Sequence, residues 1–155
     1  MAVLCTRKKC VAEIEEIVME ANERIVLVSP YIDADEGILE WLKRKPMDVD
    51  VVVIYGKKKH QSGMKDLSEV KGVTKIFVNE LHAKCFLNER KALVTSMNLY
   101  QYSQKNNEEL GVLVTRDDDE ELYKAIIKQV ERWESIGEKQ YISCLLYTSP
   151  SPRDS

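Results

Sequence analysis

The sequence lacks any apolar run that approaches the roughly 20 residues needed to cross a bilayer, so we expect no transmembrane segment. Its N-terminus has no apolar core behind a basic start, so we do not expect a secretory signal peptide. We expect a cytoplasmic location. The sequence also lacks a large excess of either charge, because its 23 Lys and Arg residues nearly balance its 26 Asp and Glu residues. This balance argues against a nucleic-acid coat over the whole surface and leaves room for a local basic patch.

Cysteines are few, and they do not form a paired set. Cys5, Cys10 and Cys85 are odd in number and widely spaced, which is not a disulfide framework and fits a reducing compartment. Cys85 is most simply a small buried hydrophobic residue. Cys5 and Cys10 could join His60 on a metal, but their spacing matches no zinc pattern, so we expect no metal site.

The fourth cysteine, Cys144, opens a stretch that we exclude from fold reasoning. Residues 144–155 break sharply in composition from the Lys- and Glu-rich segment before them. They resemble translated sequencing-adapter read-through, a tail seen on truncated metagenomic genes. We therefore expect this tail to be non-native and disordered, and the native C-terminus beyond about Ser143 to be missing.

Residues 1–143 alternate between helical and strand patterns, which predicts one α/β domain with a mixed sheet flanked by helices. An apolar face at helical spacing opens the domain between Val11 and Ala21. Continuous apolar runs that end in polar or proline-containing turns are typical of buried strands. We expect helices over 11–21, 38–45, 64–72, 99–103 and 117–133, and strands over 24–29, 49–55, 74–78, 82–87, 92–95 and 110–115.

Chemistry-bearing side chains gather around the predicted hairpin. In a strand, side chains two residues apart share a face, so His82 and Lys84 should point the same way. The returning strand delivers Ser96 and Asn98 to the same end. An imidazole, an ammonium, a hydroxyl and a carboxamide together suit a phosphoryl group, which needs a nucleophile, charge neutralisation and hydrogen-bond donors.

This order of residues resembles the HKD motif of the phospholipase D superfamily. The motif reads His-x-Lys, four residues, Asp, then Gly-Ser-x-Asn, and a downstream Asn-x-Glu. The matching residues are His82, Lys84, Glu89 at the Asp position, Thr95, Ser96, Asn98 and the pair Asn107 and Glu109. Two positions depart from the pattern. Glu89 keeps the charge of Asp, whereas Thr95 adds a Cβ where backbone approaches phosphate.

The resemblance implies a fold and a mechanism. The fold is a phospholipase D-like domain in which two HKD motifs build one active site, and since this chain has a single copy, a homodimer through the motif face is implied. His82 of one subunit would attack phosphorus and the second His82 would protonate the leaving oxygen. Lys84 and Asn98 would hold the non-bridging oxygens, Glu109 would orient the ring of His82, and Glu89 would support the loop. No metal or cofactor is implied.

Simpler interpretations stay open for several of these residues. Ser96 could be a turn hydroxyl, and Glu109 an ordinary carboxylate at the start of a strand. The loop lysines Lys57, Lys58 and Lys59 could guide a polyanionic backbone to the site, or form a solvated turn. We expect Thr95, Ser96 and these three lysines to contact the substrate. Trp41 and Trp133 lie in amphipathic segments and are expected in the core.

The sequence therefore predicts a phosphodiesterase. We favour a small dimeric nuclease acting on DNA or RNA, because neither an export signal nor an apolar entry surface is evident. A phospholipid hydrolase or phosphatidyl transferase would use the same chemistry, since the phosphodiester is common to both substrates. A catalytically weak nucleic-acid-binding module is the third alternative.

Overall fold

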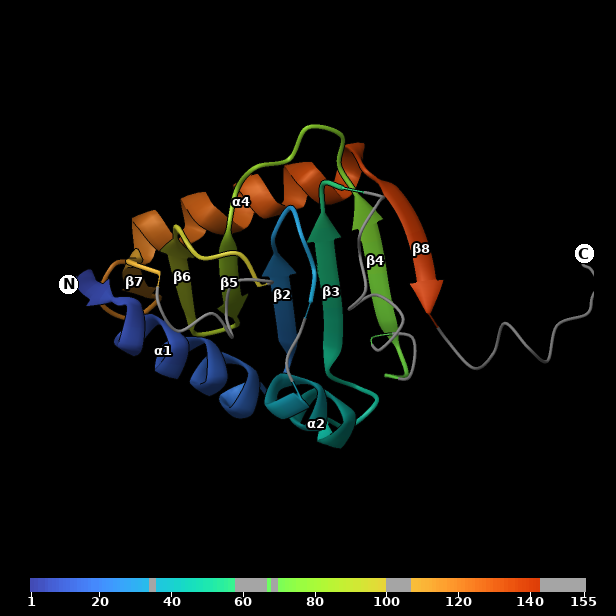
Figure 1. Cartoon of the computed structure of the whole chain (residues 1–155), viewed down its shortest axis with the longest axis horizontal. Helices are drawn as coiled ribbons and strands as arrows, with labels where there is room; N and C mark the ends of the chain where they lie inside the picture. The colour runs from blue at the N-terminus through green and yellow to red at the C-terminus, as the bar shows by residue number, and fades with distance from the viewer. Residues whose placement is uncertain (34–35, 58–66, 68–69, 100–106, 143–155) are drawn as a thin grey trace, which may run out of the picture.

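The computed structural model describes residues 1–33, 36–57, 67, 70–99 and 107–142 (Figure 1). In chain order the elements are β1 Val3–Thr6, α1 Arg7–Glu20, β2 Arg24–Val28, α2 Glu36–Arg44, β3 Asp50–Tyr55, β4 Val73–Phe77, β5 Cys85–Asn88, β6 Lys91–Thr95, β7 Leu110–Thr115, α4 Glu120–Ile136 and β8 Glu138–Ile142. No helix among these residues is long and apolar enough to cross a membrane.

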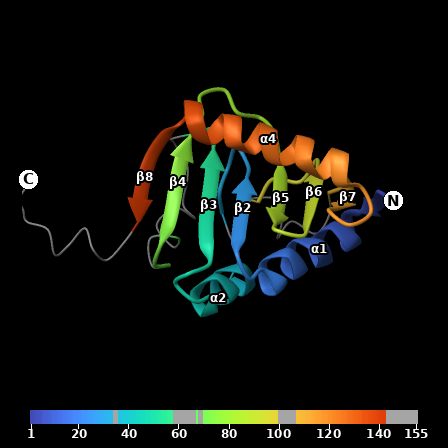
Figure 2. The same ribbon diagram turned by 180° about the vertical axis from the view of Figure 1, so that it is seen from behind.

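One mixed sheet of eight strands organises the fold, in the order β1-β7-β6-β5-β2-β3-β4-β8. The strands β2, β3 and β4 are parallel, and every other neighbouring pair is antiparallel. Helices α1 and α2 lie together, apart from α4, in both views of the molecule (Figures 1 and 2). The predicted α/β class, with a mixed sheet flanked by helices on both faces, is confirmed.

The core divides into two apolar layers because the central strands are buried on both sides. Alternate residues of β2 show the division: Ile25 and Leu27 pack in the layer that contains α1 and α2. Val26 and Val28 pack in the other layer, with Tyr123 and Val130 of α4. Such a strand reads as a continuous apolar run in the sequence, which is why β2 and β3 could be predicted.

Several boundaries differ from the predicted ones. Strands β1 and β8 were not predicted, and His82–Lys84 precede β5 instead of forming its start. The predicted helices over 64–72 and 99–103 and the loop after Lys57 fall largely outside the described residues, and the 144–155 tail falls wholly outside them.

Glu89, expected to be a supporting residue, holds the turn where α1 leads into β2. Its carboxylate accepts hydrogen bonds from the backbone N–H groups of Asn22, at 2.9 Å, and of Glu23 and Arg24, each at 3.2 Å. Partial burial acts to raise the pKa of Glu89, but these N–H donors outweigh it and lower the pKa below the ordinary 4.5. The charged carboxylate is thus stabilised in the folded protein.

The lowered pKa of Glu89 predicts a pH-dependent stability. Because the folded-state pKa lies below the unfolded one, its contribution is present above about 4.5 and is lost as the pH falls through the folded-state pKa. The Glu89→Gln variant should lose about 1 kcal/mol at pH 7, as when a helix cap is removed, and less at pH 3. Urea unfolding at both pH values measures this, with the exposed Glu15→Gln variant as the control for charge. An equal deficit at both pH values would contradict the assignment.

Candidate active site

The sheet register brings the predicted motif residues together at neighbouring ends of strands β5, β6 and β7. His82 and Lys84 directly precede β5, Ser96 and Asn98 follow β6, and Glu109 directly precedes β7. Since Cys85 pairs with Val94, and Thr95 pairs with Gly111, the starts of β5 and β7 lie beside the end of β6. Segments up to 27 positions apart in the sequence therefore meet in space.

These segments line an open, polar hollow of about 590 Å³. It is lined by His82, Lys84, Ser96, Asn98, Asn107, Glu108 and Glu109. The four residues expected to be catalytic and the expected ligand Ser96 are thus brought together. The lining combines a ring nitrogen, an ammonium, two carboxamides, a hydroxyl and two carboxylates, so it can donate hydrogen bonds to phosphoryl oxygens and accept protons.

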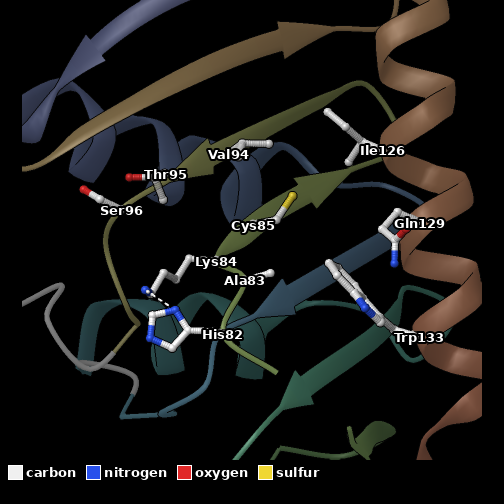
Figure 3. Close-up of a pocket in the computed structure, with 10 residues that line it drawn as sticks. All are labelled: His82, Ala83, Lys84, Cys85, Val94, Thr95, Ser96, Ile126, Gln129 and Trp133. Carbon is white, nitrogen blue, oxygen red and sulfur yellow. Dashed lines mark hydrogen bonds between the residues drawn. The ribbon is translucent and has the colours of Figure 1, made fainter. Parts of the chain in front are cut away.

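His82 and Lys84 point to the same side, although the reason differs from the predicted one. The Nζ of Lys84 lies 3.5 Å from the Nδ1 of His82. Strand β2 ends at Val28, opposite Cys85, so the three residues before Cys85 lack a partner on that side and fall outside the strand. The extended backbone keeps the alternation: Figure 3 shows His82 and Lys84 on one side and Ala83 directed toward Trp133.

Ser96 and Glu109 form a hydrogen-bonded pair across the two strand ends. The Oγ of Ser96 donates to the Oε1 of Glu109 at 2.6 Å, a length typical of a bond to a charged acceptor. The same Oγ accepts from the N–H of Leu110 at 3.1 Å. In this structure Ser96 holds the Glu109 carboxylate at the wall of the hollow, and the expected orientation of the His82 ring by Glu109 stays a prediction.

Of the other predicted ligands, the structure describes Thr95 and Lys57, and neither lines the polar hollow. The hydroxyl of Thr95 donates to the carbonyl of Leu110 at 2.8 Å and accepts from the N–H of Met97 at 3.2 Å, and the residue lies at the edge of the adjoining apolar cavity. It therefore supports the turn into Ser96. Lys57 is exposed after β3, and Lys58 and Lys59 lie outside the described residues. Glu89 lies at the opposite end of β5 from the hollow.

Sequence reasoning missed one positioning residue, Ser29. It is fully buried after β2, where its Oγ donates to the carbonyl of Tyr31 at 2.7 Å and accepts from the N–H of Leu99 at 3.0 Å. This fixes the backbone next to Asn98 against a segment 70 positions earlier. The Ser-Pro that ends a buried strand was visible in the sequence, but its partner was not.

A second, apolar cavity adjoins the hollow. Three side chains of α4, Ile126, Gln129 and Trp133, face Ala83, Cys85 and Val94 across it (Figure 3). Trp133 was expected in the core, and it does pack against the α4 layer while also lining this cavity. Burial raises the pKa of the Cys85 thiol to about 12, so this thiol is neutral at physiological pH.

Comparison with known proteins identifies the family. Residues 14–133 match the family model described as cardiolipin synthase, PLD-like domain. The chain belongs to the phospholipase D-like family. The resemblance found in the sequence is therefore confirmed, and membership supports phosphodiesterase-type chemistry. No curated protein matches the chain.

Several solved structures share the fold at low sequence identity. Nuc from Salmonella typhimurium, a phospholipase D family member, superposes with a TM-score of 0.73 at 12% identity, covering 90% of this chain and 97% of that one. NucT from Helicobacter pylori superposes with a TM-score of 0.68 at 16% identity, covering 88% of this chain and 94% of NucT. TrmBL2, an archaeal chromatin protein with a novel mode of DNA binding, superposes with a TM-score of 0.65 at 13% identity. The match covers 90% of this chain and 53% of TrmBL2.

Proposed function

We propose that this phospholipase D-like protein is a metal-independent nuclease that cleaves phosphodiester bonds through a phosphohistidine on His82. The observation that carries the proposal is the contact between His82 and Lys84 at the mouth of the polar hollow, with the Nζ and Nδ1 atoms 3.5 Å apart. This contact puts a nucleophile beside a fixed positive charge. The fold is shared with the nucleases Nuc and NucT and with a phosphatidylserine synthase. The chain matches 97% and 94% of the first two and 33% of the third, which favours nucleic acid over lipid as the substrate.

The proposed reaction has two steps. A ring nitrogen of His82 forms a bond to phosphorus while the bond to the leaving oxygen breaks, and an acid protonates that oxygen. Water then attacks the phosphohistidine, gives its proton to the same acid, now a base, and releases His82. Lys84 and Asn98 stabilise the charge that develops on the non-bridging oxygens. The pair of Ser96 and Glu109 supplies a negative charge that stabilises the imidazolium.

The acid in this proposal is His82 of a second copy, because the chain carries one motif. A contact around a two-fold axis through the hollow would bring the two rings to one phosphorus. Exposed apolar side chains next to the site support such a contact. Leu110, Val112 and Leu4 are 52%, 37% and 65% exposed on adjacent strands, and Leu110 directly follows Glu109. A second copy would cover them.

The deciding experiment is cleavage of labelled single- and double-stranded DNA and RNA by the purified protein in EDTA. We expect cleavage that the chelator does not reduce. Release of head groups from phospholipid vesicles, with no nucleic acid cleaved, would favour the lipid alternative and reject the nuclease. Binding of DNA with neither reaction would favour a binding module. Light scattering after size exclusion should give twice the 17.9 kDa mass of the chain, and an active monomer would reject the shared site.

A tight contact behind His82 predicts an effect on this activity. A Cβ added to Gly56 would lie 2.5 Å from the backbone oxygen of Leu81, the residue before His82. The Gly56→Ala variant should therefore lose about 1–3 kcal/mol of stability and displace His82, lowering cleavage at temperatures where the variant is fully folded.

The matched control for this variant is Gly72→Ala. Gly72 has a φ of +78°, so alanine is strained there as well, but its Cβ would meet only the end of Met47, at 3.7 Å. We expect destabilisation of about 1 kcal/mol with unchanged cleavage. Calorimetry and cleavage assays separate the two effects, and equal activity in both variants would contradict the role of the Gly56 contact.

A further inference from the structure

Beyond His82, Lys84 and Ser96, the residues that line the apolar cavity beside the hollow have no part in the proposed phosphoryl chemistry. The volume of this cavity is about 360 Å³, within the range of small-molecule pockets. The sheet contributes one wall and α4 the other. The side chains that line it beyond the polar hollow are Ala83, Cys85, Val94, Ile126, Gln129 and Trp133, with Thr95 at its edge.

The two cavities share residues, so one ligand can occupy both. His82, Lys84 and Ser96 line the hollow and the apolar cavity alike. Ala83 lies between the two sides of this segment: its side chain is directed toward Trp133, whereas His82 and Lys84 lie on the other side (Figure 3). Because both cavities are lined by His82, Lys84 and Ser96, a group bonded to a phosphoryl unit at His82 can reach past these residues to the space between Val94 and Trp133.

We propose that this cavity binds the nucleobase next to the phosphodiester that is held at His82. The inference rests on the proposed function and extends it, because it gives the site a contact with the base in addition to the phosphate. Trp133 supplies an aromatic surface, on which bases of any sequence can stack. Val94 and Ile126 supply apolar contacts to the rest of a flat ring.

Gln129 favours a base over an acyl chain or a second copy of the protein as the occupant. Its side chain projects from α4 on the side of the cavity, next to Trp133, in an otherwise apolar wall (Figure 3). A carboxamide can donate to and accept from the edge of a base, whereas an acyl chain offers it no partner. Gln129 is also exposed, so it is not held in place by burial in the α4 layer.

Competition with fragments of the substrate tests this inference. A nucleoside 5′-monophosphate should inhibit cleavage about 10-fold more strongly than ribose 5-phosphate, because only the former carries a base to stack. The Val94→Phe variant, which fills the cavity, should remove this difference and leave inhibition by ribose 5-phosphate unchanged. The control is Met19→Phe, on an exposed position of α1 across the sheet, which should retain the difference.

Tryptophan fluorescence gives a second readout that does not need catalysis. The sequence has two tryptophans, so Trp41→Phe leaves Trp133 as the reporter. The monophosphate should quench its emission and ribose 5-phosphate should not. Quenching without cleavage of DNA or RNA would reject the nuclease and keep the base site. DNA cleavage with equal inhibition by both phosphates would reject the base site and keep the nuclease.

Two further results would also overturn the inference. Stronger inhibition by a short-chain phosphatidic acid than by any nucleotide would assign the cavity to an acyl chain. A Trp133 emission that changes on dilution to monomer, and not with nucleotide, would assign it to the second copy of the chain.

Discussion

Replacing His82 by alanine should reduce phosphodiester cleavage by about 10³-fold or more while the protein stays folded. The size of the loss follows from the role of the ring, since no other group in the hollow would form the covalent intermediate. The stability should change by less than about 0.5 kcal/mol, because the side chain is exposed and its hydrogen-bond contact is with the neighbouring Lys84. Cleavage rates and urea unfolding measured on one preparation check both statements.

Mixing the two forms tests whether the site is shared. If each site takes one His82 from each subunit, an equimolar re-equilibrated mixture of wild type and His82→Ala should keep about a quarter of wild-type activity. Independent sites would keep about half. The Asn22→Ala variant, changed at an exposed position away from the hollow, controls for loss of activity during mixing. Retained cleavage by His82→Ala alone would remove His82 as the nucleophile.

The buried parts of the fold could be predicted from the sequence, and the edges could not. Strands β2 and β3 are buried on both faces and read as continuous apolar runs. The edge strand β1 is mostly exposed, and its apolar run is too short to mark a strand, whereas β8 has the sequence Glu-Lys-Gln-Tyr-Ile and carries neither a run nor an alternation. Their pairing partners, β7 and β4, are distant in the sequence, and pairing at an edge is set by tertiary contacts.

The candidate site also has a part that could be predicted from the sequence and a part that could not. The order His82, Lys84, Ser96, Asn98 and Glu109 lies within 28 residues, so a motif with fixed spacing could predict one polar site. The apolar cavity depends on Trp133 and Gln129, which lie on α4 with the spacing of ordinary helical core residues. Nothing local distinguishes a tryptophan that packs from one that also lines a cavity. The hydrogen bond that Ser96 donates to Glu109 was missed for the same reason, because it depends on how two strand ends meet.

The largest stability effect is expected at Asn88, which joins both helical layers to the hairpin of β5 and β6. It is 1% exposed, and its Nδ2 donates to the carbonyl of Ile17 at 2.9 Å, in the last turn of α1, where carbonyls lack partners within the helix. Its Oδ1 accepts from the N–H groups of Arg90 and Lys91, at 2.8 and 3.0 Å. The hydroxyl of Tyr123 on α4 donates to its backbone carbonyl at 2.6 Å.

The Asn88→Ala variant should therefore lose about 3 kcal/mol, because it removes three side-chain hydrogen bonds and leaves the buried Ile17 carbonyl without that donor. For a chain of this size, the melting temperature should fall by about 10 °C. Tyr123→Phe removes one bond and keeps the side chain of Asn88, so about 1 kcal/mol is expected, whereas the exposed Asn22→Ala should change less than about 0.5 kcal/mol. Equal losses in Asn88→Ala and Tyr123→Phe would mean that the Asn88 carboxamide adds nothing to the hairpin or to the end of α1.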